Sequence, residues 1–266
     1  MSPSRTIDLN ADVGEATEPD GVETERGLLG LVTSAHVACG GHAGNEETMT
    51  ATVAAALERG VRVGAHPSYP DTEGFGRRPM DIDRDELRRA LSGQLRALAT
   101  VCAQAGTQIA SVKTHGALYG EVAKGGAIYL VLRAVMAAEC PPDTTLVLPS
   151  GCPATAAALG DGVPALEEGF CDRAYRSDGT LVPRSEPGAD TSMPESSSTR
   201  RTAVAIATAP GESPWTHSVS THRVSRVPSL AQIAPRARLS ACPAASSGSV
   251  STAPGSERAT RVPSER

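Results

Sequence analysis

Four short apolar segments of the chain are each followed by polar side chains that can do chemistry. The four polar groups are Asn10-Ala11-Asp12, Gly40-Gly41-His42, His66-Pro67-Ser68-Tyr69 and Lys113-Thr114-His115. An aspartate with two or three histidines is a common ligand set for a divalent metal such as zinc. The same side chains can instead transfer protons while a lysine holds an anionic substrate. The residue types therefore predict a polar site at which metal-dependent and metal-free chemistry are both open.

The two interpretations use overlapping residues. Asp12, His42 and His66 are the best candidate metal ligands, with His115 as a fourth ligand or a general acid/base. No local motif such as His-Glu-x-x-His fixes the geometry of such ligands, which favours the metal-free interpretation. That interpretation has two sets of residues: candidate catalytic residues Asp12, His42, His66 and His115, and candidate substrate-binding residues Asn10 and Lys113, with Arg77 and Arg78.

Two further segments carry arginines. Gly74–Arg78 is a glycine-rich loop in which Arg77 and Arg78 can grip a carboxylate or phosphate, although a solvated turn is the alternative. Asp172–Arg184 is predicted to be a small hairpin around Asp178-Gly179, either a lid over the site or a solvated edge. No Gly-x-x-x-x-Gly-Lys-Ser/Thr motif is present in the sequence, so a standard P-loop nucleotide site is not expected.

The elements that must position these side chains follow from the hydrophobic pattern. Six short apolar segments rich in β-branched residues are predicted strands: 6–9, 36–39, 61–65, 109–112, 145–148 and about 165–168. Helical patterns cover 46–59, 84–105 and about 127–138. Strands separated by helices predict parallel β-α-β units, in which the carboxyl ends of all strands open on one face. The polar groups above should converge there.

Composition limits the class of protein. The 266 residues carry a formal net charge of −5 and are 39% hydrophobic, with no apolar run of about 18 residues and no signal-peptide pattern. A soluble cytoplasmic protein is expected. The six cysteines form no Cys-x-x-Cys pair, and Cys39 is expected in the core, so we predict reduced thiols and no zinc ribbon.

The composition changes near Asp190 and predicts two parts. Residues 1–190 form the expected folded body, whereas residues 191–266 contain nine Arg, no Lys, no Asp and eight Pro among many Ser and Thr. Scattered prolines and little apolar surface predict a disordered tail. The same composition is typical of a GC-rich gene translated out of frame. We prefer this interpretation of the tail to a nucleic-acid-binding role, because its arginines are dispersed along the sequence.

The body resembles the LamB/YcsF family. The resemblance rests on five ordered motifs: IDLNADVGE (7–15), SAHVACGGHAG (34–44), VGAHPSYPDTEGFGRR (63–78), VKTHGALY (112–119) and EGFCDRAYRSDGTLVPRSEPGA (168–189). It implies a seven-stranded β/α barrel of the glycoside hydrolase/deacetylase type. It also implies an ATP-dependent 5-oxoprolinase activity, the cleavage of 5-oxoproline to glutamate, performed with partner subunits B and C.

The chain departs from the family pattern at several positions. Gly41 replaces a usual aromatic residue, Thr114 a usual proline and Gly120 a usual asparagine. After Ala189 the expected helix, last strand and closing helix are missing, so the barrel is expected to be incomplete at its C-terminus, with two unpaired edges. Two alternatives stay open: a metal-dependent carbohydrate deacetylase or hydrolase on the same barrel, and an inactive truncated remnant.

Overall fold

The structure is a computed structural model of the chain, and it describes residues 8–170, 173–176, 181–182, 186–189 and 204–208. All of these lie in one compact unit, Met1–Val227. For residues 204–208 only the backbone is described.

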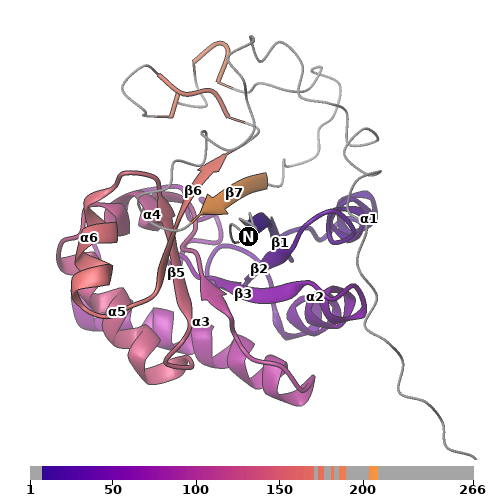
Figure 1. Ribbon diagram of the computed structural model, residues 1–266. Coiled ribbons are helices and arrows are strands. Elements are labelled where there is room, and N and C mark those ends of the chain that lie inside the picture. Colours follow the sequence, from indigo (N-terminus) through magenta and orange to yellow (C-terminus); the bar gives the residue numbers. More distant parts are fainter. Residues whose placement is uncertain (1–7, 171–172, 177–180, 183–185, 190–203, 209–266) are drawn as a thin grey trace, which may run out of the picture. The chain divides into compact units, whose positions relative to one another are not determined.

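Six parallel strands form the centre of the fold (Figure 1). They are β1 (Asp8–Val13), β2 (Ser34–Ala38), β3 (Arg62–His66), β4 (Ser111–Val112), β5 (Thr145–Pro149) and β6 (Ala165–Phe170). Each pairs with the next in sequence order, with Asp12 opposite His36 and Ala38 opposite His66. The parallel β/α architecture expected from the sequence is therefore confirmed, and all six strands point their carboxyl ends to one face.

A further strand joins the two ends of this sheet. Strand β7 (Val204–Thr208) pairs antiparallel with both β6 and β1, so the ring of strands closes. The expectation of two unpaired edges is wrong for this structure, because backbone hydrogen bonds from β7 satisfy both edges. This strand lies within residues 191–266, most of which lie outside the described residues, so the predicted boundary at residue 190 stays a prediction.

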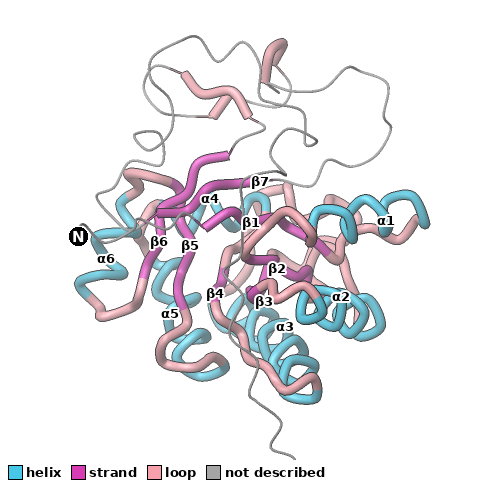
Figure 2. The backbone as a smooth tube through the Cα atoms, turned by 45° about the vertical axis from the view of Figure 1, so that its right-hand side comes forward, coloured by secondary structure: helices cyan, strands magenta, loops and turns pink. Residues whose placement is uncertain are grey.

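In the described part of the chain, six helices lie outside the strands (Figure 2). They are α1 (Pro19–Leu28), α2 (Glu46–Glu58), α3 (Arg84–Gln104), α4 (Gly116–Ala123), α5 (Ala127–Glu139) and α6 (Pro153–Gly160). The three predicted helices, α2, α3 and α5, are confirmed, and a capping box between Asn45 and Thr48 starts α2. The prediction did not include α1, α4 and α6, which are only 8–10 residues long.

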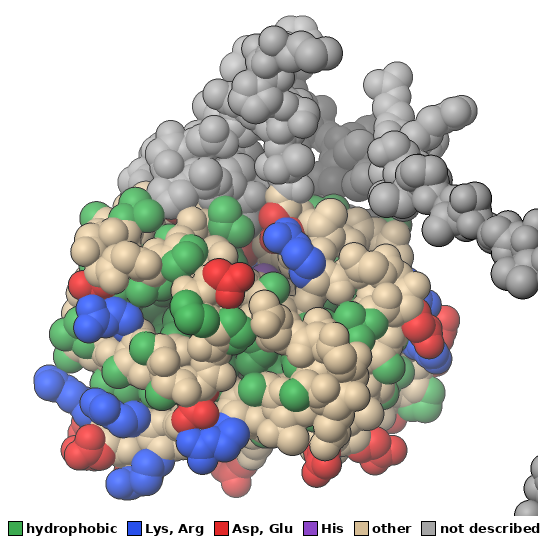
Figure 3. Space-filling view, turned by 60° about the horizontal axis from the view of Figure 1, so that its bottom comes forward, with side chains coloured by type: hydrophobic (Ala, Val, Ile, Leu, Met, Phe, Trp, Pro, Cys, Tyr) green, Lys and Arg blue, Asp and Glu red, His purple; other side chains and the backbone are tan. Residues whose placement is uncertain are grey.

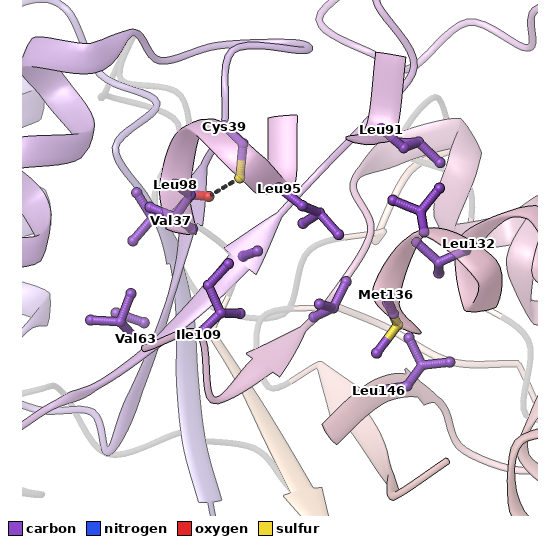
Figure 4. Packing of buried hydrophobic residues seen from close by; sticks show 14 of the residues in the cluster. Val37, Cys39, Val63, Leu91, Leu95, Leu98, Ile109, Leu132, Met136 and Leu146 are labelled. Atoms are coloured by element: carbon purple, nitrogen blue, oxygen red, sulfur yellow. Dashed lines mark hydrogen bonds between the residues drawn. The ribbon is translucent and has the colours of Figure 1, made fainter. Parts of the chain in front are cut away.

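The apolar core fills the space between the strands and the helices (Figure 4). Leu91, Leu95 and Leu98 of α3 are fully buried, and Leu132 and Met136 of α5 pack in the same cluster. This layer holds the strands at fixed positions and so determines where their carboxyl ends lie.

Cys39 belongs to the core, as predicted. Its thiol donates to the carbonyl of Val37 at 3.0 Å, and burial raises the pKa of the thiol to about 12. It is therefore a packed, unreactive side chain and not a metal ligand.

Charged side chains do not gather by sign on the face shown in Figure 3, where Lys, Arg, Asp and Glu are interspersed. Among the described residues, no helix is both long and apolar enough to cross a membrane. Of the predicted hairpin, an antiparallel bridge between Tyr175 and Leu181 is observed, while Asp178, Gly179 and Arg184 lie outside the described residues.

Candidate active site

A pocket opens at the carboxyl ends of the parallel strands. Its volume is about 310 Å³, and its lining includes Asp12, His66, Lys113 and His115 from the ends of β1, β3 and β4. The three strand ends lie far apart along the chain, and the parallel topology brings them together. The predicted convergence of polar groups is thus present in the structure.

Lys113 lies at the base of this pocket and is 1% exposed. Its ammonium lies 3.1 Å from Asp12 Oδ1 and 3.1 Å from Glu168 Oε2, and it donates to Asn10 Oδ1 at 3.2 Å. Asn10 in turn donates to Glu168. Asn10 is not among the residues that line the pocket; it lies beneath Lys113 and orients it.

Burial and charge oppose each other in this cluster. Burial raises the pKa of Asp12 to about 7, although the Lys113 charge works against the shift. Burial alone would lower the pKa of Lys113, but Asp12 and Glu168 raise it above its ordinary value, so the ammonium stays charged. Asp12 therefore sits near the midpoint of its titration at neutral pH, which suits a proton-transfer group.

Three histidines and a glutamate form a second cluster beside the first. Glu15 Oε1 lies 2.9 Å from His42 Nε2, 3.4 Å from His115 Nδ1 and 3.8 Å from His66 Nε2. The rings of His42 and His115 stack with centroids 3.7 Å apart, and the His66 ring stands edge-on to both. His42, His66 and His115 are thus brought together as predicted.

Glu15 is the site residue that the sequence interpretation overlooked. It belongs to the quoted motif at residues 7–15, but it lies beyond the strand end and was not singled out there. A buried carboxylate, Glu25 of α1, accepts hydrogen bonds from the backbone of Gly14 at 2.8 Å, Glu15 at 3.2 Å and Ala16 at 3.0 Å. These bonds turn the chain after β1 so that Glu15 faces the histidines.

Asp12 has a different place from the one predicted for a metal ligand. One oxygen pairs with Lys113, and the other lies 3.5 Å from His66 Nε2. The group whose ligand atoms all lie within 4.8 Å of one another is Glu15, His42, His66 and His115. Among the described residues, the structure therefore puts Glu15 in the position that sequence reasoning gave to Asp12.

The two arginines of the glycine-rich loop, Arg77 and Arg78, have different surroundings. Arg77 lines the pocket, with its guanidinium 4.9 Å from the centre of the Phe75 ring. Arg78 pairs with Asp71 and Glu73 and is not among the lining residues. Arg173 of the predicted hairpin also lines the pocket and donates to the Val182 carbonyl at 2.7 Å. The anion-binding candidates that face the pocket are therefore Arg77 and Arg173.

Tyr119 and Phe170 line the pocket, and Glu168 is buried behind Tyr119 and Lys113. The Tyr119 hydroxyl donates to Glu168 Oε1 at 2.7 Å, and burial raises the pKa of the hydroxyl well above its ordinary value. The Phe170 ring lies 4.9 Å from the Lys113 ammonium. Two of these residues, Tyr119 and Glu168, stand at the ends of quoted motifs, but no pattern in the sequence pointed to their pairing.

A family model described as the LamB/YcsF family matches residues 7–213. The chain belongs to the LamB/YcsF family. The polar groups of both clusters lie inside the matched range, and so does β7.

Individual relatives agree with this assignment. The 5-oxoprolinase A subunit of Methylococcus capsulatus is 47% identical over 188 residues, 70% of this chain and 71% of that protein. The protein of the same name from Symbiobacterium thermophilum is 43% identical, and the match covers 73% of this chain and 74% of that protein. A solved structure, a lactam utilization protein from Thermus thermophilus, is 36% identical with a TM-score of 0.62, covering 69% of this chain and 74% of that one.

Proposed function

We propose that this LamB/YcsF family member is the A subunit of a 5-oxoprolinase, which opens the ring of 5-oxoproline to give glutamate. The observation that carries the proposal is the pocket at the strand ends. There a buried lysine lies among carboxylates beside a cluster of histidines, in a chain 41–47% identical to proteins named as that subunit. The names of these relatives support a lactam substrate and not the carbohydrate substrate of the alternative hypothesis.

The chemistry requires the groups that the pocket contains. A five-membered lactam is a stabilised amide, so we propose that ATP transfers its phosphoryl group to the amide oxygen. Water then attacks the ring carbon, the C–N bond breaks, and the ring nitrogen takes a proton to become the amine. A second water releases phosphate from the acyl phosphate, which leaves glutamate, ADP and phosphate.

In this reaction the chain's own residues position and exchange protons. We assign the carboxylate of the substrate to Arg77, where a guanidinium can form paired hydrogen bonds. The charged Lys113 stabilises the negative charge of the phosphoryl oxygens once that group is attached to the amide oxygen. Asp12, with its pKa raised to about 7, is placed to take a proton from the attacking water and to return it to the ring nitrogen.

The histidines are assigned a supporting part in this scheme. Burial lowers the pKa of His66 well below its ordinary value and that of His115 to about 3, so both are neutral at pH 7. Neutral imidazoles do not repel the charged Lys113, as buried imidazolium ions would, so they leave the ammonium in place beside the substrate. The sequence also predicts that His42 and His115 are catalytic, and we keep both as candidate catalytic residues in this proposal.

Two further elements of the proposal concern the assembly and the fold. The relatives are named as one subunit of an enzyme, which supports a complex, and we propose that this chain acts with subunits B and C in the cytoplasm. We also propose that the six parallel strands and β7 are a variant of the glycoside hydrolase/deacetylase type of barrel, in which an antiparallel strand takes the place of the seventh parallel one.

The test is reconstitution of the full chain with the partner subunits of a relative's 5-oxoprolinase. Glutamate is measured with 5-oxoproline and ATP, with ATP omitted, and with each protein component omitted in turn. ATP-dependent glutamate that requires this chain supports the proposal. If the relative's own equivalent of this chain restores activity in the same mixture and this chain does not, the proposal fails and the inactive-remnant alternative takes its place.

A further inference from the structure

The hydrogen bonds of two neighbouring histidines fix which of their nitrogens carry protons. His66 Nδ1 lies 2.7 Å from the Lys113 carbonyl, and His115 Nε2 lies 3.0 Å from the Phe75 carbonyl. A carbonyl oxygen only accepts, so each of these nitrogens must be the protonated one. The other nitrogen of each neutral ring therefore carries a lone pair.

Those two lone pairs face each other. His66 Nε2 and His115 Nδ1 are 2.9 Å apart, and both side chains are buried. Two lone pairs at this distance repel unless a positive charge lies between or beside them. A proton shared between the two rings is one source of that charge, and a metal ion bound by both nitrogens is another.

A metal ion satisfies the same geometry without a proton. Ligand nitrogens about 2.0–2.1 Å from a divalent ion are separated by about 2.9–3.4 Å when they occupy neighbouring coordination positions. The His66–His115 separation of 2.9 Å and the Glu15–His115 separation of 3.4 Å lie in this range. The carbonyl partners of the two histidines act as the outer contacts that usually orient metal-bound imidazoles.

The positions of Glu15 and His42 are also compatible with a metal site. Glu15 Oε1 lies 2.9 Å from His42 Nε2 and 3.4 Å from His115 Nδ1, so its carboxylate can supply an anionic ligand beside the imidazoles. His42 Nε2 hydrogen-bonds Glu15 Oε1 at 2.9 Å, whereas His42 Nδ1 is buried without a hydrogen-bond partner among the described residues. Binding of the ion by Nε2 therefore requires the ring proton to move to Nδ1, where no contact opposes it. Three imidazoles and one carboxylate suit zinc or another transition metal.

We propose that Glu15, His42, His66 and His115 bind one divalent transition-metal ion, and that Asp12 is not a ligand. Asp12 stays paired with Lys113, and the site adjoins the pocket through Glu15, His66 and His115. When bound, the ion would supply a Lewis acid beside the pocket. The proposal stands on the histidine geometry and does not depend on which reaction the protein catalyses.

The experiment measures zinc bound by the full-length chain. The protein is stripped with a chelator, dialysed against Zn²⁺ and analysed for metal content and for affinity by calorimetry. His217 and His222, in the part of the chain outside the described residues, are removed in a His217→Ala/His222→Ala background so that they cannot contribute. One zinc per chain in that background is expected, and no retained zinc would overturn the proposal.

Two matched carboxylate variants identify the ligand. Glu15→Gln should weaken zinc binding at least about tenfold, whereas Asp12→Asn should change it less than about threefold. His115→Gln is a second ligand variant, and circular dichroism of each variant checks that it is folded. Co²⁺ in place of zinc provides an optical readout of the site. Equal losses in the Glu15 and Asp12 variants, or a larger loss in Asp12→Asn, would show that the assigned ligand set is wrong.

Discussion

The ammonium of Lys113 lies 3.1 Å from the carboxylate of Glu168, between the ends of β4 and β6, with both side chains buried. Asp12 lies at the same distance on the β1 side. One cation thus contacts two carboxylates, one from β1 and one from β6. Removing it leaves both of them buried without their partner, which is far more costly than losing an ion pair in water.

We therefore expect Lys113→Met to lower the free energy of unfolding by about 3–5 kcal/mol. Lys124→Met is the matched control, because Lys124 is exposed and pairs with Glu121 at the surface, where ion pairs contribute about 0–1 kcal/mol. Urea unfolding of both variants at pH 7 measures the difference. Similar losses in the two variants would contradict the role given to Lys113.

Arg77 and Arg78 are neighbours in sequence with different surroundings. Arg77 lines the pocket, and Arg78 pairs with Asp71. If Arg77 binds the substrate carboxylate, Arg77→Ala should raise KM for 5-oxoproline about tenfold, equivalent to about 1.4 kcal/mol, with a smaller change in kcat. Arg78→Ala should leave KM near the wild-type value. The reconstituted enzyme measures both, and a larger rise for Arg78→Ala would reverse the assignment.

His36 predicts a loss of stability in acid. It is fully buried, its Nε2 contacts the Ser111 hydroxyl at 3.0 Å, and its Nδ1 lies 3.9 Å from Asp12 Oδ1. Burial, with the charges of Lys113 and Arg62, lowers its pKa well below 6.5. Below pH 6.5 the unfolded chain therefore binds a proton at this position that the folded protein does not. The free energy of unfolding decreases as the pH is lowered, by up to about 1.4 kcal/mol per pH unit.

His36→Gln should remove this part of the pH dependence. Buried His66 and His115 act in the same direction and Asp12, with its raised pKa, in the opposite one, but all three are present in both proteins. The difference between the two proteins therefore reports on His36. Urea unfolding between pH 7 and pH 5 with a chelator present is the measurement, and parallel curves would refute the expectation.

Replacing Gly116 or Gly120 of α4 by alanine should have opposite effects on the free energy of unfolding. Gly116 has φ +58°, and a Cβ there would lie 2.3 Å from the Gly76 carbonyl oxygen, next to the glycine-rich loop. Gly120 has open space around its Cβ position. Gly116→Ala should cost about 1–3 kcal/mol or more, whereas Gly120→Ala should stabilise the helix by up to about 1 kcal/mol. Thermal unfolding of both variants tests this, and a stable Gly116→Ala protein would contradict it.

Much of the architecture follows from local patterns. The alternation of β-branched strands with helical repeats identifies six strands and three of the helices, because burial on both faces of a parallel sheet requires continuous apolar segments. The short helices α1, α4 and α6 are not evident in the same way. They are only 8–10 residues long, and helices this short are unstable alone, so packing against the barrel stabilises them.

Residue types at the strand ends also predict the site, since parallel strands bring their carboxyl ends together. The pattern indicates Asp12, His42, His66, Lys113 and His115, and the structure places all of them at one end of the barrel. The pattern does not indicate Glu15 or Glu168. The turn after β1 determines the partners of Glu15, and the closure of the sheet determines those of Glu168.

The sequence by itself determined the family motifs, the six parallel strands and the chemical types that gather at their ends. Only the tertiary structure decided that Glu15 faces the histidines while Asp12 pairs with Lys113, and that Val204–Thr208 closes the ring. The physical reason is that hydrophobic periodicity encodes which face of an element is buried. The direction of a particular carboxylate depends instead on backbone hydrogen bonds, such as those to Glu25, between residues that no local pattern connects.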